Sequence, residues 1–438
     1  MTASWLYMAG TLIGLWFTVQ AIRPVALPKR PSIPSFFAGW LTNELALHHI
    51  FWQAVVSAVF IAYGALGHWA GWVAVGLTML QWTLNLYLVK VAIEAGDVME
   101  EVLRGTLGGD YRDDLPGSPR GWDRPDWKRL IIPFRIKHPW VERERNIVYE
   151  RVAATNLKLD IFRTREARWP GEPLEKRPVL IYVHGGAWFL GFRDRQGGPL
   201  LTEMAARGWI GILPSYRLSP TATAPEHVED VKRAIAWVRR HADELGADPD
   251  FIALAGNSAG GHLAALAAMT GTDTTYQPGF EDADCRVQAC VPLYGVYDVA
   301  DERGRRQPEM TDYMARFVIK ADLDEEPERW HRFSPLAQLH TDAPPFLIVH
   351  GAKDSLTSPK ESEEFASNLA DISAAPVGLA MLPGAQHAFD TFPSIRTAFT
   401  VRGVARFLAT VHARWQHGRA VAPATSGATI ARGDDDHD

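Results

Sequence analysis

The chain has 438 residues, a formal net charge of −6 and 22% charged residues, so its length allows one large core with an accessory region. This mildly acidic balance, with no basic stripe, argues against nucleic-acid binding. The two cysteines, Cys285 and Cys290, have no metal-type partners nearby in the sequence, and we expect two unpaired thiols rather than a disulfide. Charge is unevenly distributed, since the residues before Ile93 include few charged ones: Arg23, Lys29, Arg30, Glu44 and Lys90.

Three apolar runs in the first part of the chain, residues 5–22, 47–66 and 69–89, are each near the length that crosses a hydrocarbon core. They predict a helical transmembrane region over residues 1–93. A buried soluble helical subdomain is disfavoured, because it would have very few charges for its solvent face. The first run lacks the basic start and the cleavage site of a signal peptide, so we interpret it as an anchor. Polar residues within the runs are expected at helix–helix contacts: Gln53, Gln81 and Asn85.

The basic residues predict the orientation of this region. Arg23, Lys29 and Arg30 lie between the first two runs and Lys90 follows the third, so three spans place all four on one side. The excess of Lys and Arg in cytoplasmic loops assigns that side to the cytosol. We therefore expect an integral protein of the plasma membrane, with the N-terminus outside and the part of the chain after the third run, which includes the catalytic residues considered below, in the cytosol.

The remaining chain divides into three segments. Residues 94–145 are interpreted as a linker that could also cap a cleft, because about residues 104–141 are rich in Gly, Pro and charge. Over residues 146–412, strand patterns alternate with helix patterns, which predicts an α/β domain with a mostly parallel sheet covered on both faces. The tail, residues 413–438, is predicted to be disordered. The expected strands are 146–151, 158–163, 178–183, 209–214, 251–255, 287–293, 346–349 and 377–381, and the expected helices are 224–245, 259–269, 359–369 and 394–411.

A G-x-S-x-G motif follows the apolar run 251–255 and precedes a helical pattern. A serine on such a strand-to-helix turn has its hydroxyl exposed at the edge of the sheet, where a base can reach it. Gly256 and Gly260 permit the turn, because a side chain at either position would crowd the neighbouring backbone. Ser258 is therefore the candidate nucleophile.

Two further residues at strand ends complete a catalytic set. In sheets of this type, ligands bind beyond the carboxyl ends of the strands. His387 follows the last expected strand of the domain and Asp354 follows the strand before it, in the chain order Ser, Asp, His. Acyl transfer needs a base for the serine proton and a carboxylate that holds this base. We predict that Ser258, His387 and Asp354 form a catalytic triad.

Other histidines and carboxylates compete for these roles. His350 precedes Asp354 by four residues and is interpreted as a packing or hydrogen-bonding residue. His262 lies one turn into the helix after Ser258 and is expected to point away from it. Asp298 and Asp390 are alternative acids, although Asp390 is too close in sequence to His387 for the usual geometry.

A glycine-containing turn, His184-Gly185-Gly186-Ala187-Trp188, follows the expected strand 178–183. Glycines there let backbone N–H groups face the cleft, which is what stabilisation of a developing oxyanion requires. His184 is expected to support this turn.

These blocks resemble the hormone-sensitive-lipase-like branch of the α/β-hydrolase carboxylesterases, over about residues 146–411. Further matching blocks are Ser215–Pro220, Asp354–Leu356 and His387–Phe389. The resemblance implies the same triad and an oxyanion hole from the N–H groups of Gly185, Gly186 and Ala259. Two positions depart from the family pattern, because Ala187 replaces a third glycine and Asn257 replaces an aspartate.

The sequence favours a membrane-anchored serine esterase or lipase that cleaves a carboxylic ester, small or lipidic, through an acyl-enzyme. No metal or organic cofactor is expected; the expected partners are the ester substrate and the bilayer. One alternative is hydrolysis of another acyl bond: a formamide, a prenylcysteine methyl ester or a peptide. A hydrolase fold that serves only as a membrane scaffold is disfavoured, because the whole catalytic set is present.

Overall fold

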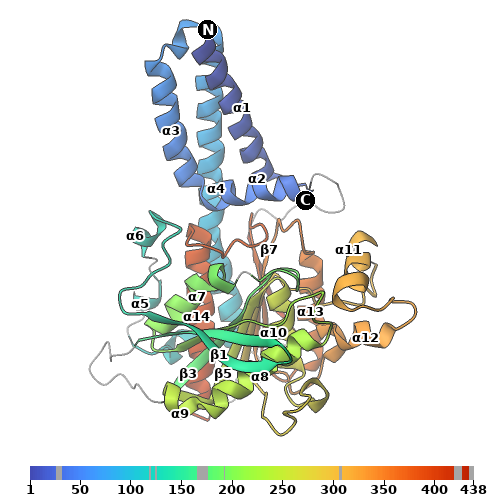
Figure 1. Cartoon of the computed structure of the whole chain (residues 1–438). Coiled ribbons are helices and arrows are strands. Elements are labelled where there is room, and N and C mark those ends of the chain that lie inside the picture. Colours follow the sequence, from blue (N-terminus) through green and yellow to red (C-terminus); the bar gives the residue numbers. More distant parts are fainter. Residues whose placement is uncertain are drawn as a thin grey trace.

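The computed structural model describes residues 1–25, 32–117, 120–123, 126–164, 176–191, 193–304, 308–418 and 427–433. In this part of the chain, a helical stalk stands on a domain built around a twisted sheet (Figure 1).

The sheet has the strand order β1-β2-β4-β3-β5-β6-β7-β8-β9. The pairs β1/β2 and β2/β4 are antiparallel, and every later pair is parallel. Parallel strands need crossovers, and the intervening helices supply them. The strands are β1 Glu142–Val152, β2 Thr155–Arg163, β3 Arg177–Val183, β4 Ile210–Pro214, β5 Ala247–Asn257, β6 Ala289–Leu293, β7 Phe346–Gly351, β8 Val377–Leu382 and β9 Thr429–Arg432.

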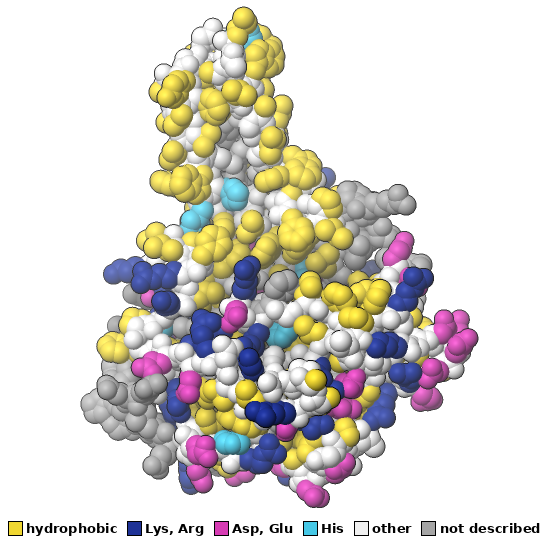
Figure 2. Space-filling view, in the orientation of Figure 1, with side chains coloured by type: hydrophobic (Ala, Val, Ile, Leu, Met, Phe, Trp, Pro, Cys, Tyr) yellow, Lys and Arg dark blue, Asp and Glu magenta, His cyan; other side chains and the backbone are white. Residues whose placement is uncertain are grey.

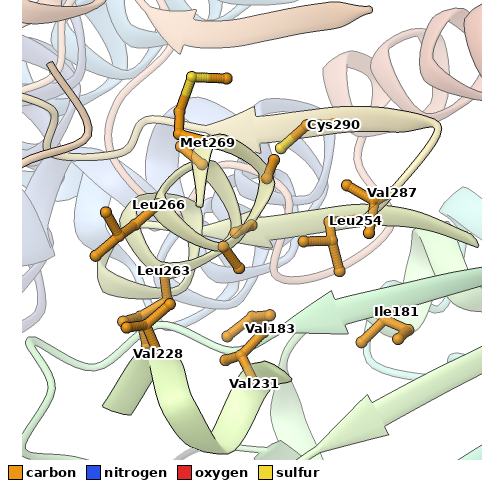
Figure 3. Close-up of a cluster of buried hydrophobic side chains, with 14 of the residues drawn as sticks. Ile181, Val183, Val228, Val231, Leu254, Leu263, Leu266, Met269, Val287 and Cys290 are labelled. Atoms are coloured by element: carbon orange, nitrogen blue, oxygen red, sulfur yellow. The ribbon is translucent and has the colours of Figure 1, made fainter. Parts of the chain in front are cut away.

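Helices cover both faces of this sheet, which explains why β3, β6, β7 and β8 are buried at every position. On β3, Ile181 and Val183 belong to one apolar cluster, whereas Leu180 and Tyr182 belong to the other. The first cluster includes α8 (Glu226–Arg240), α10 (Ala259–Met269) and α13 (Pro359–Ile372). Figure 3 shows side chains of α8 and α10 packed against β3 and β5 in this cluster. On the opposite face lie α7 (Gly198–Ala206), α14 (Ile395–Gln416) and part of α4.

The stalk is formed by α1 (Thr2–Ile22), α3 (Ala46–Ala62) and the first half of α4 (Trp69–Leu107). A short helix, α2 (Ser32–Glu44), lies across its base and meets α3 at a bend of 90°. By length and composition, α1 and α4 could each cross a membrane, and the bent pair α2–α3 is a third candidate. The second and third apolar runs form a helical hairpin, joined through Ala65–Gly67.

The expected boundary at residue 93 is wrong at the level of secondary structure, because α4 continues without a break to Leu107. Beyond Ile93, buried residues recur at helical spacing: Ala95, Val98, Met99, Val102 and Leu103. They join the apolar cluster shared with α14 and β8. The first part of the expected linker is therefore a core helix of the domain.

The expected disorder of the tail is wrong for two segments. Residues 413–416 belong to α14, and Thr429–Arg432 form β9, which pairs in parallel with β8. Ala431 is fully buried there. Residues 419–426 and 434–438 lie outside the described residues.

Shorter elements fill the connections: Tyr111–Asp114, α5 Arg120–Asp123, α6 Trp127–Leu130, Arg193–Arg195, α9 Ala242–Leu245, Thr274–Tyr276, α11 Pro308–Tyr313, Met314–Val318, α12 Pro327–Arg332 and Pro335–Gln338. Cys285 and Cys290 are both buried and unbridged, as expected.

Candidate active site

Ser258 lies on a sharp turn between β5 and α10. Its φ of 54° and ψ of −125° are an uncommon backbone conformation for a residue other than glycine. The turn closes on the neighbouring backbone so tightly that a Cβ on Gly260 would lie 2.1 Å from the carbonyl oxygen of Val183. A Cβ on Gly256 would lie 2.3 Å from the carbonyl oxygen of Gly260. The glycines of the motif are therefore required by close approach.

The structure brings the three predicted catalytic residues together. The Ser258 Oγ lies 2.9 Å from His387 Nε2, and His387 Nδ1 lies 2.7 Å from Asp354 Oδ2. Asp354 follows β7 and His387 follows β8, so both come from loops at the carboxyl edge of the sheet, as Ser258 does. This arrangement can transfer a proton from the hydroxyl to the imidazole while the carboxylate stabilises the charged ring.

Asp354 is held as a carboxylate. Its Oδ1 accepts hydrogen bonds from the backbone N–H groups of Leu356 (2.8 Å) and Thr357 (2.9 Å). Burial disfavours the charged form, but the charge of His387 and hydrogen bonds from His350 and His387 outweigh it, so the pKa of this carboxyl lies well below its usual range. The group therefore remains negative wherever the enzyme is folded at ordinary pH.

The N–H of Gly185, which the sequence analysis expects to be an oxyanion donor, has two acceptors within the protein. Its N–H already donates to Gln196 Oε1 (2.6 Å) and to Asn257 Oδ1 (2.9 Å). No hydrogen-bond acceptor for the N–H groups of Gly186, Ala187 or Ala259 is present within the described residues. Ala187, two positions after Gly185 in the same turn, has a positive φ of 52°.

Asn257 is a site residue whose role the sequence did not predict. Its Oδ1 accepts from the Gly185 N–H, while its Nδ2 donates to the Tyr294 hydroxyl at 3.2 Å. That hydroxyl in turn donates to the buried Asp390, which also accepts from Tyr182 at 2.8 Å. Burial raises the pKa of Asp390 above its ordinary value. Asp390 thus anchors this chain of hydrogen bonds, while Asp354 occupies the position beside His387.

The remaining candidates have other partners. His262 accepts from the Trp188 indole (3.1 Å) and donates to the Phe333 carbonyl (2.7 Å), away from Ser258 as expected. His350 lies behind Asp354, at 3.3 Å from its Oδ2. Asp298 accepts from the Glu302 backbone.

His184 stabilises the glycine-containing turn formed by residues 184–188. Its ring stacks on Tyr216 at 4.5 Å and donates to the Gly185 carbonyl at 2.9 Å. Burial lowers the pKa of His184 to about 4, so the ring is neutral at physiological pH. The hydroxyl of Tyr313, from α11, donates to the Ala187 carbonyl at 2.7 Å and braces the other side of the turn.

One face of α2 contacts the loop that bears His387. The Phe36 ring lies 6.4 Å from the His387 ring, edge-on, and the Trp40 indole donates to the Ala388 carbonyl at 2.9 Å. Asn43 donates to the Gly384 carbonyl at 2.6 Å, and Glu44 forms a buried ion pair with Arg396. These four residues recur at helical spacing, so α2 is fixed over the active-site edge of the sheet.

Known proteins share this architecture. The family model BD-FAE matches residues 166–369. The probable carboxylic ester hydrolase LipM of Mycobacterium tuberculosis is 36% identical over 417 residues, covering 93% of this chain and 94% of that protein. Esterase LipC of the same organism is 40% identical, covering 72% of this chain and 75% of LipC. Thermogutta terrifontis esterase 2, phosphonylated by sarin, superposes with a TM-score of 0.50 at 24% identity, covering 61% of this chain and 93% of that one.

The strand order and the serine turn define an α/β-hydrolase. The chain belongs to the hormone-sensitive-lipase-like carboxylic ester hydrolases of that fold. Its match to LipM extends into the N-terminal stalk, since it covers 93% of the chain. Within the described residues, no group of three His, Cys, Asp or Glu side chains is arranged to hold a metal ion.

Proposed function

We propose that the protein is a membrane-anchored serine esterase whose active site faces the bilayer. The observation that supports it most strongly is the continuous hydrogen-bonded arrangement of Ser258, His387 and Asp354, at 2.9 and 2.7 Å. Nucleophile, base and orienting acid within hydrogen-bond distance are the geometric signature of covalent acyl transfer.

In this mechanism Ser258 Oγ attacks the ester carbonyl carbon while His387 Nε2 takes its proton. The imidazolium then gives that proton to the departing alcohol, and the acyl group stays on Ser258. Water, deprotonated by His387, then attacks the carbonyl carbon of the acyl-enzyme. The bond to Ser258 Oγ breaks, His387 returns the proton to that oxygen, and the carboxylic acid leaves. Asp354 keeps Nδ1 of His387 protonated and stabilises the imidazolium in both half-reactions.

The oxyanion of each tetrahedral intermediate is stabilised by the backbone N–H groups of Gly186, Ala187 and Ala259. Each such donor typically contributes on the order of 10²–10³ to kcat. Gly185 has a different function in this proposal, because its N–H attaches the turn to Asn257 and Gln196.

The distribution of polarity in the stalk supports membrane insertion. Its interior contains hydrogen-bonded polar side chains beside small apolar ones: the Tyr7 hydroxyl contacts Ser57 (2.9 Å) and Thr78 (3.1 Å), and the Gln81 amide donates to the Thr11 carbonyl. Its outer surface is apolar, as Figure 2 shows. A water-soluble helical bundle has the opposite arrangement, with apolar residues inside. Outward-facing residues of the stalk include Leu6, Leu12, Ile13, Trp16, Val55, Val56, Val59, Val73 and Leu80.

The bend between α2 and α3 supports the orientation of the active site. If α3 spans the bilayer, the 90° bend places α2 along the membrane surface. The outer side of α2 exposes Ile33, Phe37 and Leu41, as expected of a helix that lies in an interface. Its inner side contacts the His387 loop, so the active site would lie directly beneath the headgroups. Lipophilic esters are the substrates that this position favours.

A fluorophosphonate probe tests the catalytic part of the proposal. The full-length protein in detergent should be labelled once, and Ser258→Ala should abolish labelling and lower kcat for a carboxylic ester by about 10⁴–10⁶-fold. Ser367→Ala, a change at an exposed serine on α13, should leave both unchanged. Labelling that persists in the Ser258→Ala protein would rule out Ser258 as the nucleophile.

The choice of substrate is tested by a series of acyl esters of increasing chain length, presented in mixed micelles, with amides and short peptides for comparison. We expect kcat/KM to rise with acyl length and esters to exceed amides. A preference for short, soluble esters would contradict access from the bilayer while leaving the esterase proposal intact.

A further inference from the structure

A large apolar cavity lies where the stalk meets the catalytic domain. Its volume is about 850 Å³, within the usual range for ligand sites of about 300–1,000 Å³. One wall is the start of α3, with Leu47 and Phe51, and the opposite wall is the segment Leu130–Phe134. We refer to it as the junction cavity. It lies beside α2, at the level that the proposed function assigns to the membrane surface.

The side chains around the junction cavity are unusually exposed for apolar residues. Ile131 is 70% exposed and Phe134 is 71% exposed, and Phe51 on the stalk is 61% exposed. Together they extend the apolar surface of the stalk onto the domain, as the yellow area below the stalk in Figure 2 shows. An apolar surface of this size in contact with water would be unfavourable, which indicates that an apolar ligand or medium covers it.

A second, smaller pocket of about 70 Å³ adjoins the junction cavity, because Leu130 and Pro393 line both. It differs in its charge. We refer to it as the basic pocket, because four cationic side chains and only two carboxylates line it. The cations are Arg129, Arg135, Lys137 and Arg402, and the carboxylates are Asp126 and Glu203.

Both carboxylates of the basic pocket already have cationic partners. Asp126 pairs with Arg129 at 3.1 Å, and Glu203 pairs with Arg207 at 2.6 Å. Nη1 of Arg402 is buried without a hydrogen-bond partner among the described residues. Arg135 and Lys137 are exposed and form no ion pair within the described part of the chain. The pocket therefore has positive charge to offer an anion.

We propose that the junction binds one anionic glycerophospholipid of the bilayer, with acyl chains in the junction cavity and the phosphate on Arg135, Lys137 and Arg402. An apolar site that shares a wall with a cationic one matches the two ends of such a molecule. A zwitterionic lipid fits less well, because both carboxylates that could bind its cationic group are already paired. The inference rests on the membrane location proposed above but not on the esterase chemistry.

Native mass spectrometry of the full-length Ser258→Ala protein tests it, because that variant cannot consume the lipid. Phosphatidylglycerol should be retained at one molecule per protein, and phosphatidylcholine with the same acyl chains should be bound much more weakly. Arg135→Gln/Lys137→Gln should weaken phosphatidylglycerol binding by about 30-fold, roughly fivefold for each cation removed. The matched change Arg151→Gln/Lys158→Gln, at exposed cations of the β1–β2 hairpin, should have no effect.

The apolar half of the site is tested separately. Ile131→Ser/Phe134→Ser should also weaken phosphatidylglycerol binding, and glycerol phosphate, which has the headgroup chemistry without chains, should not compete at equal concentration. Circular dichroism melting confirms that each variant is folded. The proposal is overturned by equal retention of phosphatidylcholine, by full competition from glycerol phosphate, by unchanged binding in both folded variants, or by a lipid-free dimer that closes the cavity.

Discussion

The side chain of Asn257 joins the two loops on either side of Ser258. It accepts a hydrogen bond from the Gly185 N–H, in the turn after β3, and donates one to the hydroxyl of Tyr294, in the loop after β6. The residue is fully buried beside the nucleophile, so it has little freedom to make other contacts. In the proposed mechanism Asn257 is therefore a positioning residue, which acts through Gly185 on the N–H groups proposed to bind the oxyanion.

Replacement of Asn257 should lower kcat more than it raises KM. In Asn257→Leu, Gly185 keeps only the Gln196 acceptor, and the loss of one buried hydrogen bond corresponds to a decrease of about 10-fold in kcat. Gln196→Leu should behave similarly, and the double variant should fall further because the Gly185 N–H then has no acceptor. Steady-state kinetics on a soluble ester measure the effect, and a double variant with wild-type kcat would refute it.

His412 makes the stability of the domain sensitive to acid. Its ring lies among aromatic rings, 4.6 Å from Phe251 and 5.7 Å from Trp209, and burial lowers its pKa to about 4. The unfolded chain takes up this proton near pH 6.5, whereas the folded chain does so only near pH 4. Stability from this residue is therefore present above about pH 6.5 and is lost as the pH falls toward 4.

His412→Phe should remove that dependence, since phenylalanine fits the aromatic surroundings and does not titrate. Thermal melts at pH 7 and pH 4.5 should show a smaller drop in Tm for the variant, with a difference of at most about 3 kcal/mol in unfolding free energy. An equal drop in Tm for both proteins would contradict the assignment. At pH 7 the two should have similar stability.

The three residues of the proposed triad can be predicted from the sequence, because each follows an apolar strand and the carboxyl ends of parallel strands meet at one edge of the sheet. The sequence does not predict which backbone N–H groups of the turn 184–188 remain available to an oxyanion. Which N–H in the turn stays available depends on Gln196 and Asn257, and side chains that approach from other loops leave no signal in the turn itself. Asn257 stands where the family pattern has an aspartate, but its partners, Gly185 and Tyr294, come from other loops and are recognisable only in the folded structure.

Among the helices and strands, the second half of α4 is predictable from its apolar pattern, but the change in composition along the chain favours a different interpretation. Ala95, Val98, Met99 and Val102 repeat at helical spacing, but the sudden rise in charge after Ile93 suggested a linker. The strand β9 had no comparable signal, because four residues pair with β8 only where the packed domain offers its edge. The sequence of α2 does contain a helical pattern with two distinct faces. The residues on the face toward the domain are Phe36, Trp40, Asn43 and Glu44, and those on the outer face are Ile33, Phe37 and Leu41.

Strand β9 should contribute measurably to stability. Ala431 is fully buried against α4 and β8, so Ala431→Asp places an unpaired carboxylate in the core and should lower the free energy of unfolding by about 3 kcal/mol or more. Arg432→Gln, which removes only a half-exposed ion pair with Glu363, should cost less than about 1 kcal/mol. Urea unfolding measures both. Equal stability of the Ala431→Asp and wild-type proteins would show that β9 is dispensable.

At the scale of the whole molecule, the N-terminus lies at the far end of the stalk from the catalytic domain (Figure 1). If α1, α3 and α4 each cross the bilayer, the N-terminus and the catalytic domain lie on opposite sides of it. Arg23 and Lys90, near the domain end of α1 and within α4, then mark the cytoplasmic side.

Protease treatment of oriented vesicles should reveal this topology. In inverted inner-membrane vesicles the catalytic domain should be digested, while a tag at the N-terminus should be protected. In intact spheroplasts the pattern should be reversed. A catalytic domain that resists protease in inverted vesicles and is digested in spheroplasts would place it outside the cell and refute the cytoplasmic assignment.

The unbroken helix α4 joins the stalk to the core of the catalytic domain. Its 39 residues span about 58 Å as a single rod, with no linker at the point where it would leave the membrane. An enzyme tethered by a flexible chain samples a volume of cytosol, whereas this one would be held at a constant height and tilt above the bilayer. Its encounters with substrate would then be two-dimensional, and its rate would follow the number of ester molecules per unit area of membrane rather than their concentration in the cell.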